Sequence, residues 1–134
     1  MDEAAIRRIE LFSGLSRKQR KLLAMRADEV DVPAGKVLCA KGRVAHEFFV
    51  IEDGTAEVIR DGQYLDDLGP GDCFGEMGLI DDSPRNADVI ARTPLTLMVL
   101  SGSALKDLER ECPPLARRIS RLVEQRRDWL QPVP

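Results

Sequence analysis

The chain has 134 residues, of which 43% are hydrophobic and 32% are charged, and its formal net charge is −3 at pH 7. This length fits a single domain whose core is large enough to fold without disulfides, and the small charge gives no general attraction to nucleic acid or anionic lipid. No apolar run reaches the ~18 residues of a membrane helix, and the three scattered cysteines suit neither a disulfide framework nor a zinc site. We therefore expect one domain over residues 1–134, with reduced thiols, in the cytoplasm.

The N-terminal part of the chain has a helical pattern. A short charged helix is predicted to end at Ser13-Gly14, with its apolar residues on one side: Ile6, Ile9, Leu11 and Phe12. Ser16 is a typical N-cap residue and predicts a second helix over residues 16–26. In that helix Leu22 and Leu23 are expected to face the core.

After the helices, short apolar runs alternate with turn residues, which indicates strands. We expect residues 48–51 and 56–59 to pair as a hairpin, because Asp53-Gly54 between them is a favoured two-residue turn. A second such turn, Asp61-Gly62, leads to a strand over residues 64–68. Two Asp-Gly turns so close together predict an antiparallel meander.

The strand pattern is interrupted once. It stops over residues 73–85 and resumes with strands at residues 89–90 and 95–100. Either Ser101 or Ser103 is then expected to cap a helix, because serine at this position accepts a hydrogen bond from a backbone N–H of the first turn.

That helix is predicted to end near Cys112, and Pro113-Pro114 to begin a last helix that ends near residue 128. The order of helices, then many short strands, then helices predicts an α+β domain. We expect an antiparallel β-roll, a double-stranded jelly roll, over residues 28–100, flanked by N-terminal helices and by C-terminal helices over residues 101–128.

Residues 71–87 contain the groups with chemical meaning. Gly75 allows the backbone to approach a ligand closely, and residues 77–80 can form a helical turn whose N–H groups face an anion. Glu76 offers a carboxylate to a sugar hydroxyl, and Arg85 offers a planar guanidinium to a phosphate. Together these groups fit a ribose phosphate.

At these residues the sequence resembles the cyclic nucleotide-binding domain family, in which a Gly-Glu-(Leu/Met)-(Ala/Gly)-Leu run is followed by Pro-Arg-x-Ala. The two runs here are Gly75-Glu76-Met77-Gly78-Leu79 and Pro84-Arg85-Asn86-Ala87. The resemblance extends from about residue 10 to about residue 125 and includes further phrases at residues 11–16, 32–35, 49–54 and 68–72. It implies a β-roll fold and a cyclic nucleotide, cAMP or cGMP, as the ligand.

The resemblance also implies a role for each matching residue. Glu76 would bind the ribose 2′-hydroxyl and Arg85 the cyclic phosphate, while backbone N–H groups complete the phosphate cradle: Gly75, Met77, Gly78, Asn86 and Ala87. The last helix would close over the base with an apolar stripe: Leu115, Ile119, Leu122 and Val123. Because Asn86, and not threonine, follows the arginine, cAMP is expected to be preferred over cGMP.

Several features leave alternatives open. Asp88 stands where the family often has Thr, Ser or Asn, and a carboxylate near a cyclic phosphate weakens binding unless it points away. Glu76 and Arg85 can also be interpreted as a structural ion pair on a surface turn. The arginine-rich last helix is either a solvated face or a contact for an acidic partner or nucleic acid.

His46 is the only histidine, which argues against a clustered-histidine metal site and against Ser-His-Asp or Cys-His catalysis. We therefore expect neither enzymatic activity nor a cofactor, and, because residues 129–134 contain no helix-turn-helix, no direct DNA binding. The main hypothesis is a regulatory domain whose C-terminal helix responds to the nucleotide, with a homodimer or a downstream effector as further partner. The alternative is a degenerate β-roll that serves only as an interaction or dimerisation scaffold.

Overall fold

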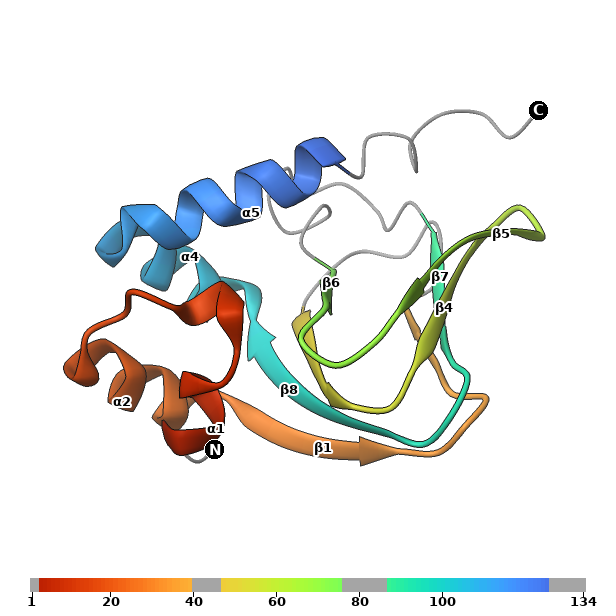
Figure 1. The fold of residues 1–134 in the computed structure, drawn as a ribbon, viewed down its shortest axis with the longest axis horizontal. Coiled ribbons are helices and arrows are strands. Elements are labelled where there is room, and N and C mark those ends of the chain that lie inside the picture. The colour runs from red at the N-terminus through yellow and green to blue at the C-terminus, as the bar shows by residue number, and fades with distance from the viewer. Residues whose placement is uncertain (1–2, 40–46, 76–86, 126–134) are drawn as a thin grey trace.

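The computed structural model describes residues 3–39, 47–75 and 87–125, and the structural statements below concern these ranges. Two four-stranded antiparallel sheets form a roll, and the helices gather at one end of it (Figure 1). Sheet A consists, in spatial order, of β1 (Asp28–Val32), β8 (Leu95–Ser101), β3 (Glu47–Asp53) and β6 (Cys73–Phe74). Sheet B consists of β2 (Val37–Cys39), β7 (Asp88–Ala91), β4 (Ala56–Arg60) and β5 (Gln63–Leu68). The predicted α+β fold with an antiparallel β-roll is confirmed.

The predicted hairpin at Asp53-Gly54 is wrong, because β3 and β4 lie in different sheets. Gly54 has a φ of 95°, and a Cβ at this position would lie 2.3 Å from the backbone oxygen of Pro94. The Thr55 N–H donates a hydrogen bond to Thr93 Oγ1 at 3.0 Å. The segment is therefore a corner of the roll that packs against the corner between β7 and β8, where only glycine allows so close an approach.

The second Asp-Gly pair is a hairpin turn, as predicted. Asp61 and Gly62 have φ angles of 52° and 80°, which is the pattern of a type I′ turn, and Arg60 pairs with Gln63 across it. The antiparallel meander predicted from the two turns is therefore wrong at the first of them. An Asp-Gly pair predicts a tight turn, but the sheet to which each strand belongs depends on packing far along the chain.

The predicted break over residues 73–85 begins too early. Cys73 and Phe74 form β6, and they pair with Val50 and Phe49 of β3 at the edge of sheet A. A strand of two residues has no periodicity that a sequence pattern can show. Residues 76–86 lie outside the described part of the chain.

The N-terminal segment contains two short helices where one was predicted: α1 (Glu3–Arg7) and the 3-10 helix η1 (Glu10–Phe12). The backbone bonds here join residues three apart, as in the N–H of Ile9 to the carbonyl of Ile6 and the N–H of Phe12 to the carbonyl of Ile9. The apolar spacing of three suits 3-10 turns, which have three residues per turn. All three of these side chains are consequently buried.

The next helix, α2 (Arg17–Arg26), begins as predicted. Ser16 accepts a hydrogen bond from the backbone N–H of Gln19, and the Gln19 side chain accepts one from the N–H of Ser16, which completes a capping box. Leu23 is fully buried, whereas Leu22 is 40% exposed, so the prediction that both face the core is wrong for Leu22. Neighbouring residues of a helix point about 100° apart, and the buried stripe of α2 takes only one of the two.

The C-terminal helices are α4 (Gly102–Glu111) and α5 (Pro113–Gln125). Ser101 is the N-cap of α4, and its side chain accepts a hydrogen bond from the N–H of Ala104 at 3.2 Å. Of the two predicted caps, Ser101 and not Ser103 is therefore correct. The predicted end of the last helix near residue 128 lies outside the described residues.

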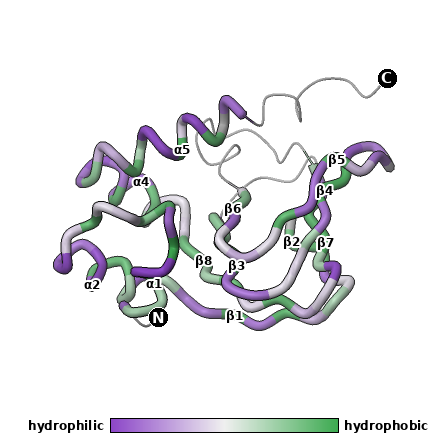
Figure 2. The backbone as a smooth tube through the Cα atoms, viewed as in Figure 1, coloured by the Kyte–Doolittle hydropathy of each residue, from purple (hydrophilic) through white to green (hydrophobic). Residues whose placement is uncertain are grey.

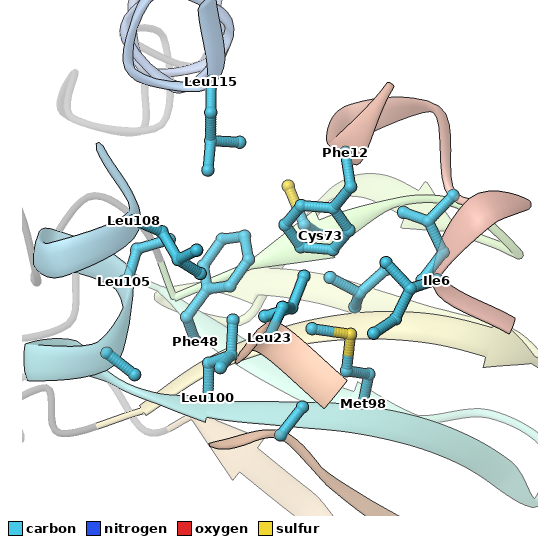
Figure 3. Packing of buried hydrophobic residues seen from close by; sticks show 14 of the residues in the cluster. Ile6, Phe12, Leu23, Phe48, Cys73, Met98, Leu100, Leu105, Leu108 and Leu115 are labelled. Atoms are coloured by element: carbon cyan, nitrogen blue, oxygen red, sulfur yellow. The ribbon is translucent and has the colours of Figure 1, made fainter. Parts of the chain in front are cut away.

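The buried apolar residues form two cores, which we call the roll core and the helical core. The roll core lies between the two sheets and contains Phe49, Ile51, Ala56, Val58, Leu68, Phe74, Ala87, Val89, Ala91, Leu95, Leu97 and Val99. The helical core lies between sheet A and the helices (Figure 3) and includes Ile6, Phe12, Leu23, Phe48, Cys73, Met98, Leu100, Leu105, Leu108, Leu115 and Ile119. In Figure 2 the strands and helices alternate between polar and apolar segments, as expected when each element buries one face.

Candidate functional site

The structure describes only the two ends of the predicted nucleotide site. Gly75 directly follows β6, and Ala87 directly precedes β7. Five further predicted site residues lie outside the described part of the chain: Glu76, Met77, Gly78, Arg85 and Asn86. Their assigned roles remain predictions, and so does the alternative that Glu76 and Arg85 form a structural ion pair.

The first end of the site is held by aromatic packing. Phe74, which is 1% exposed, stacks on Phe49 with ring centroids 4.8 Å apart and an interplanar angle of 17°. Gly75 then takes a φ of 92°, a conformation that side chains with a Cβ strongly disfavour. The chain therefore leaves β6 through a glycine bend immediately after a fixed aromatic anchor.

The second end of the site is held in the opposite sheet. Ala87 is 4% exposed and Val89 is 3% exposed, and both belong to the roll core. β7 lies between β2 and β4 in the middle of sheet B, so it is paired on both sides. The segment between Gly75 and Ala87 thus joins the edge of one sheet to the centre of the other, and the residues next to both of its ends are packed in the roll core.

Asp88 does not point into the roll. It alternates along β7 with Val89 and Ala91, which are buried in the roll core, while Asp88 and Ile90 are only partly buried. Side chains of neighbouring strand residues point to opposite faces of a sheet. The Asp88 carboxylate consequently lies on the outer face of sheet B, and it is no objection to an anion inside the roll.

The predicted lid residues of the last helix are largely covered already. Leu115 and Ile119 are 0% exposed in the helical core, and Leu122 packs against that core. Figure 3 shows Leu115 pointing toward Phe12, Phe48 and Leu108. The placement of the Val123 side chain lies outside the described part of the structure. The apolar stripe of α5 therefore has a surface to cover without any nucleotide.

Arg118 ties α5 to the N-terminal segment. Its Nη1 donates a hydrogen bond to the carbonyl of Leu11 at 3.0 Å and a second one to the carbonyl of Ser13, both in or next to η1. The basic last helix thus has one arginine that is structural, while Arg117 and Arg121 are exposed. The sequence contained no signal for this role, because the acceptors are backbone carbonyls that any residue provides.

A carboxyl pair lies on the face of sheet A that is turned toward the helices, and the sequence did not reveal it. Burial and a side-chain hydrogen bond with Glu29 raise the pKa of Glu52 from 4.5 to about 7. A carboxyl group can donate a hydrogen bond to another only when it holds a proton, and the raised pKa favours the protonated form of Glu52 below about pH 7. Asp31, which accepts a hydrogen bond from Thr96 Oγ1 at 2.8 Å, adds to the negative charge, and Arg8 opposes it.

Of the two carboxyl residues, Glu52 lines a cavity of about 320 Å³, together with Ala5, Arg8, Ile9, Ile51, Pro70 and Gly71. Among the described residues no group of three or more histidine, cysteine, aspartate or glutamate side chains is arranged to hold a metal ion. None of the described helices is long and apolar enough to cross a membrane. Cys73 and Cys112 are both free thiols and both buried.

An antiparallel roll of two four-stranded sheets flanked by helices defines a β-roll of the jelly-roll class. The family profile described as "Cyclic nucleotide-binding domain" matches residues 29–112 of the chain, which includes this segment. The chain therefore belongs to the cyclic nucleotide-binding domain family, and the predicted family is confirmed.

Individual relatives agree with this assignment. The chain is 36% identical over 96 residues to a cAMP-dependent protein kinase regulatory subunit of Schizosaccharomyces pombe, covering 71% of this chain and 23% of that protein. Among solved structures, "cAMP bound PfPKA-R" has a TM-score of 0.87 and 23% identity, covering 96% of this chain and 44% of the other. The catabolite activator protein of Thermus thermophilus has a TM-score of 0.76 and 29% identity, covering 87% of this chain and 57% of the other. The chain thus spans about a quarter of the kinase regulatory subunit that it matches.

Proposed function

We propose that the domain binds cyclic AMP at the segment between Gly75 and Ala87, without chemical conversion, and that binding changes the packing of α5. The observation that carries the proposal is that the family profile covers this segment while both of its ends are fixed in the roll core. Cyclic AMP is the ligand named for the Schizosaccharomyces pombe relative and for the structure with a TM-score of 0.87. The free, buried Cys73 and Cys112 suit the reducing cytoplasm in which we place the domain.

Within this proposal Glu76 accepts a hydrogen bond from the ribose 2′-hydroxyl and Arg85 pairs with the cyclic phosphate. Gly75 can contribute a backbone N–H because its φ of 92° turns the chain sharply at the end of β6. The outward orientation of Asp88 supports the proposal, since it places this carboxylate on the outer face of sheet B and not in the roll interior.

The decisive measurement is a calorimetric titration of the whole chain with cyclic AMP and cyclic GMP. Arg85→Ala is expected to weaken cyclic AMP binding by more than about a hundredfold, because two charge-assisted hydrogen bonds of ~1.5–3 kcal/mol each are lost. Arg85→Lys is expected to be nearly as weak, because an ammonium group lacks the planar fork. Arg92→Ala is the matched control, because Arg92 pairs with Glu57 and Asp67 on the outer face of the roll.

The outcomes separate the two functions considered. If the wild-type chain binds neither nucleotide, the domain is the degenerate scaffold and the proposal fails. If the wild type binds and Arg85→Ala binds equally well, the nucleotide site stands but the phosphate role of Arg85 does not. A preference for cyclic GMP of tenfold or more, ~1.4 kcal/mol, contradicts the base choice inferred from Asn86.

The regulatory output is expected at the C-terminal part of α5, through which an effector protein would sense the ligand. Leu115 and Ile119 are already fully buried in the helical core, so ligand binding can increase their burial very little. Ser120, Arg121, Glu124 and Gln125 are exposed, so this end of the helix can gain contacts when the ligand binds. Saturating cyclic AMP should therefore increase amide protection from hydrogen exchange at residues 120–125 more than at residues 115–119. Equal protection with and without ligand over the whole helix would mean that ligand binding does not change the packing of α5.

A further inference from the structure

The outer face of α2 is basic and partly apolar, and nothing in the proposed nucleotide function uses it. We call this surface the α2 face; it consists of Arg17, Lys18, Lys21, Leu22 and Met25. These five side chains line a shallow hollow of about 420 Å³. Met25 is 83% exposed and Leu22 is 40% exposed, and they are two of only a few large apolar side chains on the surface of the described residues.

The basic residues of α2 fall into two groups. Arg20 bonds to Glu3 at 3.0 Å and to the carbonyl of Leu15, and Arg26 bonds to Asp107 at 2.8 Å, so both serve the fold. The three cations of the α2 face differ, since no described carboxylate forms an ion pair with any of them: Arg17, Lys18 and Lys21. Like charges at helix spacings of three and four destabilise a helix by ~0.2–0.5 kcal/mol per pair. Their clustering therefore costs stability and contributes nothing visible to the fold.

The apolar part of the surface continues toward α4. Leu22 also lines a second hollow, of about 270 Å³, that lies between α2 and α4 and includes Leu23 and Leu108. An occupant that covers Met25 and Leu22 can thus extend its apolar contact into the groove between the two helices. Methionine is unbranched and flexible, and it adapts its shape to a partner surface.

We propose that the α2 face docks an acidic amphipathic helix of a partner protein. The apolar side of such a helix would cover Leu22 and Met25, and carboxylates beside that stripe would pair with Lys18 and Lys21. This is the helix-in-groove mode of recognition, in which apolar anchors recur at helical spacing. The complementary charges add specificity and speed association.

An anionic membrane surface fits this face less well. β1 directly follows α2 and carries the exposed acidic residues Asp28 and Glu29, and the far side of the groove carries Asp107 and Glu111. A flat anionic surface would meet these carboxylates together with the cations, whereas a narrow helix can lie between them. Two exposed apolar side chains also bury little area compared with the apolar face of a membrane-surface helix.

The probe for the test is a synthetic peptide of about 14 residues, or ~4 helical turns, with leucine at one-face spacing and glutamate elsewhere. Its binding to the whole chain is measured by fluorescence anisotropy in low salt, without nucleotide. Met25→Asp and the double variant Lys18→Glu/Lys21→Glu are each expected to weaken binding by about tenfold or more. Because these side chains are exposed, the variants should keep the thermal midpoint of the wild type to within a few degrees.

Matched controls lie elsewhere on the surface. Val37→Asp changes a 50% exposed apolar residue of β2, and Lys36→Glu changes an exposed cation beside it. Both should bind the peptide as the wild type does, and a peptide with the same composition but scrambled leucines should bind at least tenfold more weakly. Equal binding of the scrambled peptide, or equal loss with the control variants, overturns the proposal.

Two further arms test the other occupants. If vesicles containing phosphatidylserine bind the chain through Met25 and Lys21 while the peptide does not bind, the face is a lipid contact and the proposal is wrong. If sedimentation shows a dimer of the chain that Met25→Asp dissociates, the occupant is a second copy and the proposal is again wrong. Absence of all three interactions means that the face is solvated, which also overturns it.

Discussion

The roll core and the helical core differ in how the chain builds them. The roll core draws all its residues from the strands and turns of the β-roll, residues 32–99. The helical core combines residues near the start of the chain, such as Ile6 and Phe12, with residues near its end, such as Leu115 and Ile119. The first core fixes the ends of the proposed nucleotide site, and the second holds the helix proposed as the output.

Sheet A separates the two cores and contributes side chains to both. Along β3, Phe48 and Val50 face the helical core while Phe49 and Ile51 face the roll core. In β6, Cys73 faces the helices and Phe74 the roll, and Gly75 follows directly. The strand that leads into the proposed site therefore contacts the helical core with one residue and the roll core with the next. The proposed binding site and the proposed output helix thus contact opposite faces of one sheet.

The largest expected effect separates the two faces of β3. Phe48→Ala should lower the free energy of unfolding by ~3–5 kcal/mol, because a fully buried aromatic side chain is removed and a cavity remains. Urea denaturation followed by circular dichroism measures this loss. Among folded molecules the variant should also expose α5 amides to hydrogen exchange, and it should lower nucleotide affinity less than a substitution on the roll-core face of β3 does.

Phe49→Ala is the matched variant on the other face of the same strand. It removes the ring that stacks on Phe74, so it should reduce nucleotide affinity while the α5 amides keep their protection. If both variants change α5 protection and nucleotide affinity to the same extent, the two faces of β3 do not have separate roles.

The second prediction concerns the corner between the sheets. Gly54→Ala should destabilise the fold by roughly 2–5 kcal/mol, because a Cβ would lie 2.3 Å from the backbone oxygen of Pro94 and φ is 95°. Gly62→Ala is the control, since its φ of 80° is also positive but a Cβ there meets nothing within 4 Å. It should cost only ~1–2 kcal/mol, the conformational part alone. Equal losses in thermal or urea melts would mean that the contact with Pro94 is unimportant.

Some features of the fold could be predicted from local sequence patterns, and others could not. The cap at Ser16 and the Asp61-Gly62 hairpin follow from local chemistry and were predicted, and the cap of α4 was predicted as one of two serines. The assignment of β3 and β4 to different sheets was not, because Gly54 is required by a contact with Pro94, 40 residues away along the chain. Local patterns determine turns and caps, whereas sheet membership depends on distant contacts.

The candidate site also has features that the sequence predicted and features that it did not. The glycine, glutamate and arginine pattern indicated the family directly, and Gly75 and Ala87 lie where the chain passes between the sheets. The packing of α5 was predicted only as a lid, since apolar spacing shows that a helix has a buried stripe but not what covers it. The Glu29–Glu52 pair joins two strands that are not neighbours in sequence, so no local pattern marks it.

The third prediction tests the connection between the two ends of the chain. Arg118→Ala should lower the free energy of unfolding by ~1–2 kcal/mol, because two hydrogen bonds from a charged donor to the carbonyls of Leu11 and Ser13 are lost. Hydrogen exchange should rise in η1 and α5 and stay unchanged in β4 and β5. Arg117→Ala, at an exposed position of the same helix, is the control and should be neutral. A uniform rise in exchange over both cores would contradict a local role.

The smallest expected effect is a pH dependence that arises where α1 and η1 meet sheet A. In the folded chain the pKa of Glu52 is raised from 4.5 to about 7, chiefly by burial and by the hydrogen bond with Glu29. Between these two values the folded chain holds a proton that the unfolded chain has released, so stability falls as pH rises through this window. The wild type should therefore be more stable at pH 5 than at pH 8.

Glu52→Gln should remove this contribution, because the amide stays neutral and can donate to Glu29 at every pH in the range. The thermal midpoint of Glu52→Gln minus that of the wild type should be near zero or negative at pH 5 and positive, by a few degrees, at pH 8. Every other ionisable group is the same in the two proteins, so its contribution cancels in this difference. Glu57→Gln removes a carboxylate that pairs with Arg92 on the outer face of the roll and should leave the wild-type pH dependence in place. A difference between Glu52→Gln and the wild type that does not change from pH 5 to pH 8 would show that protonation of Glu52 does not contribute to the pH dependence of stability.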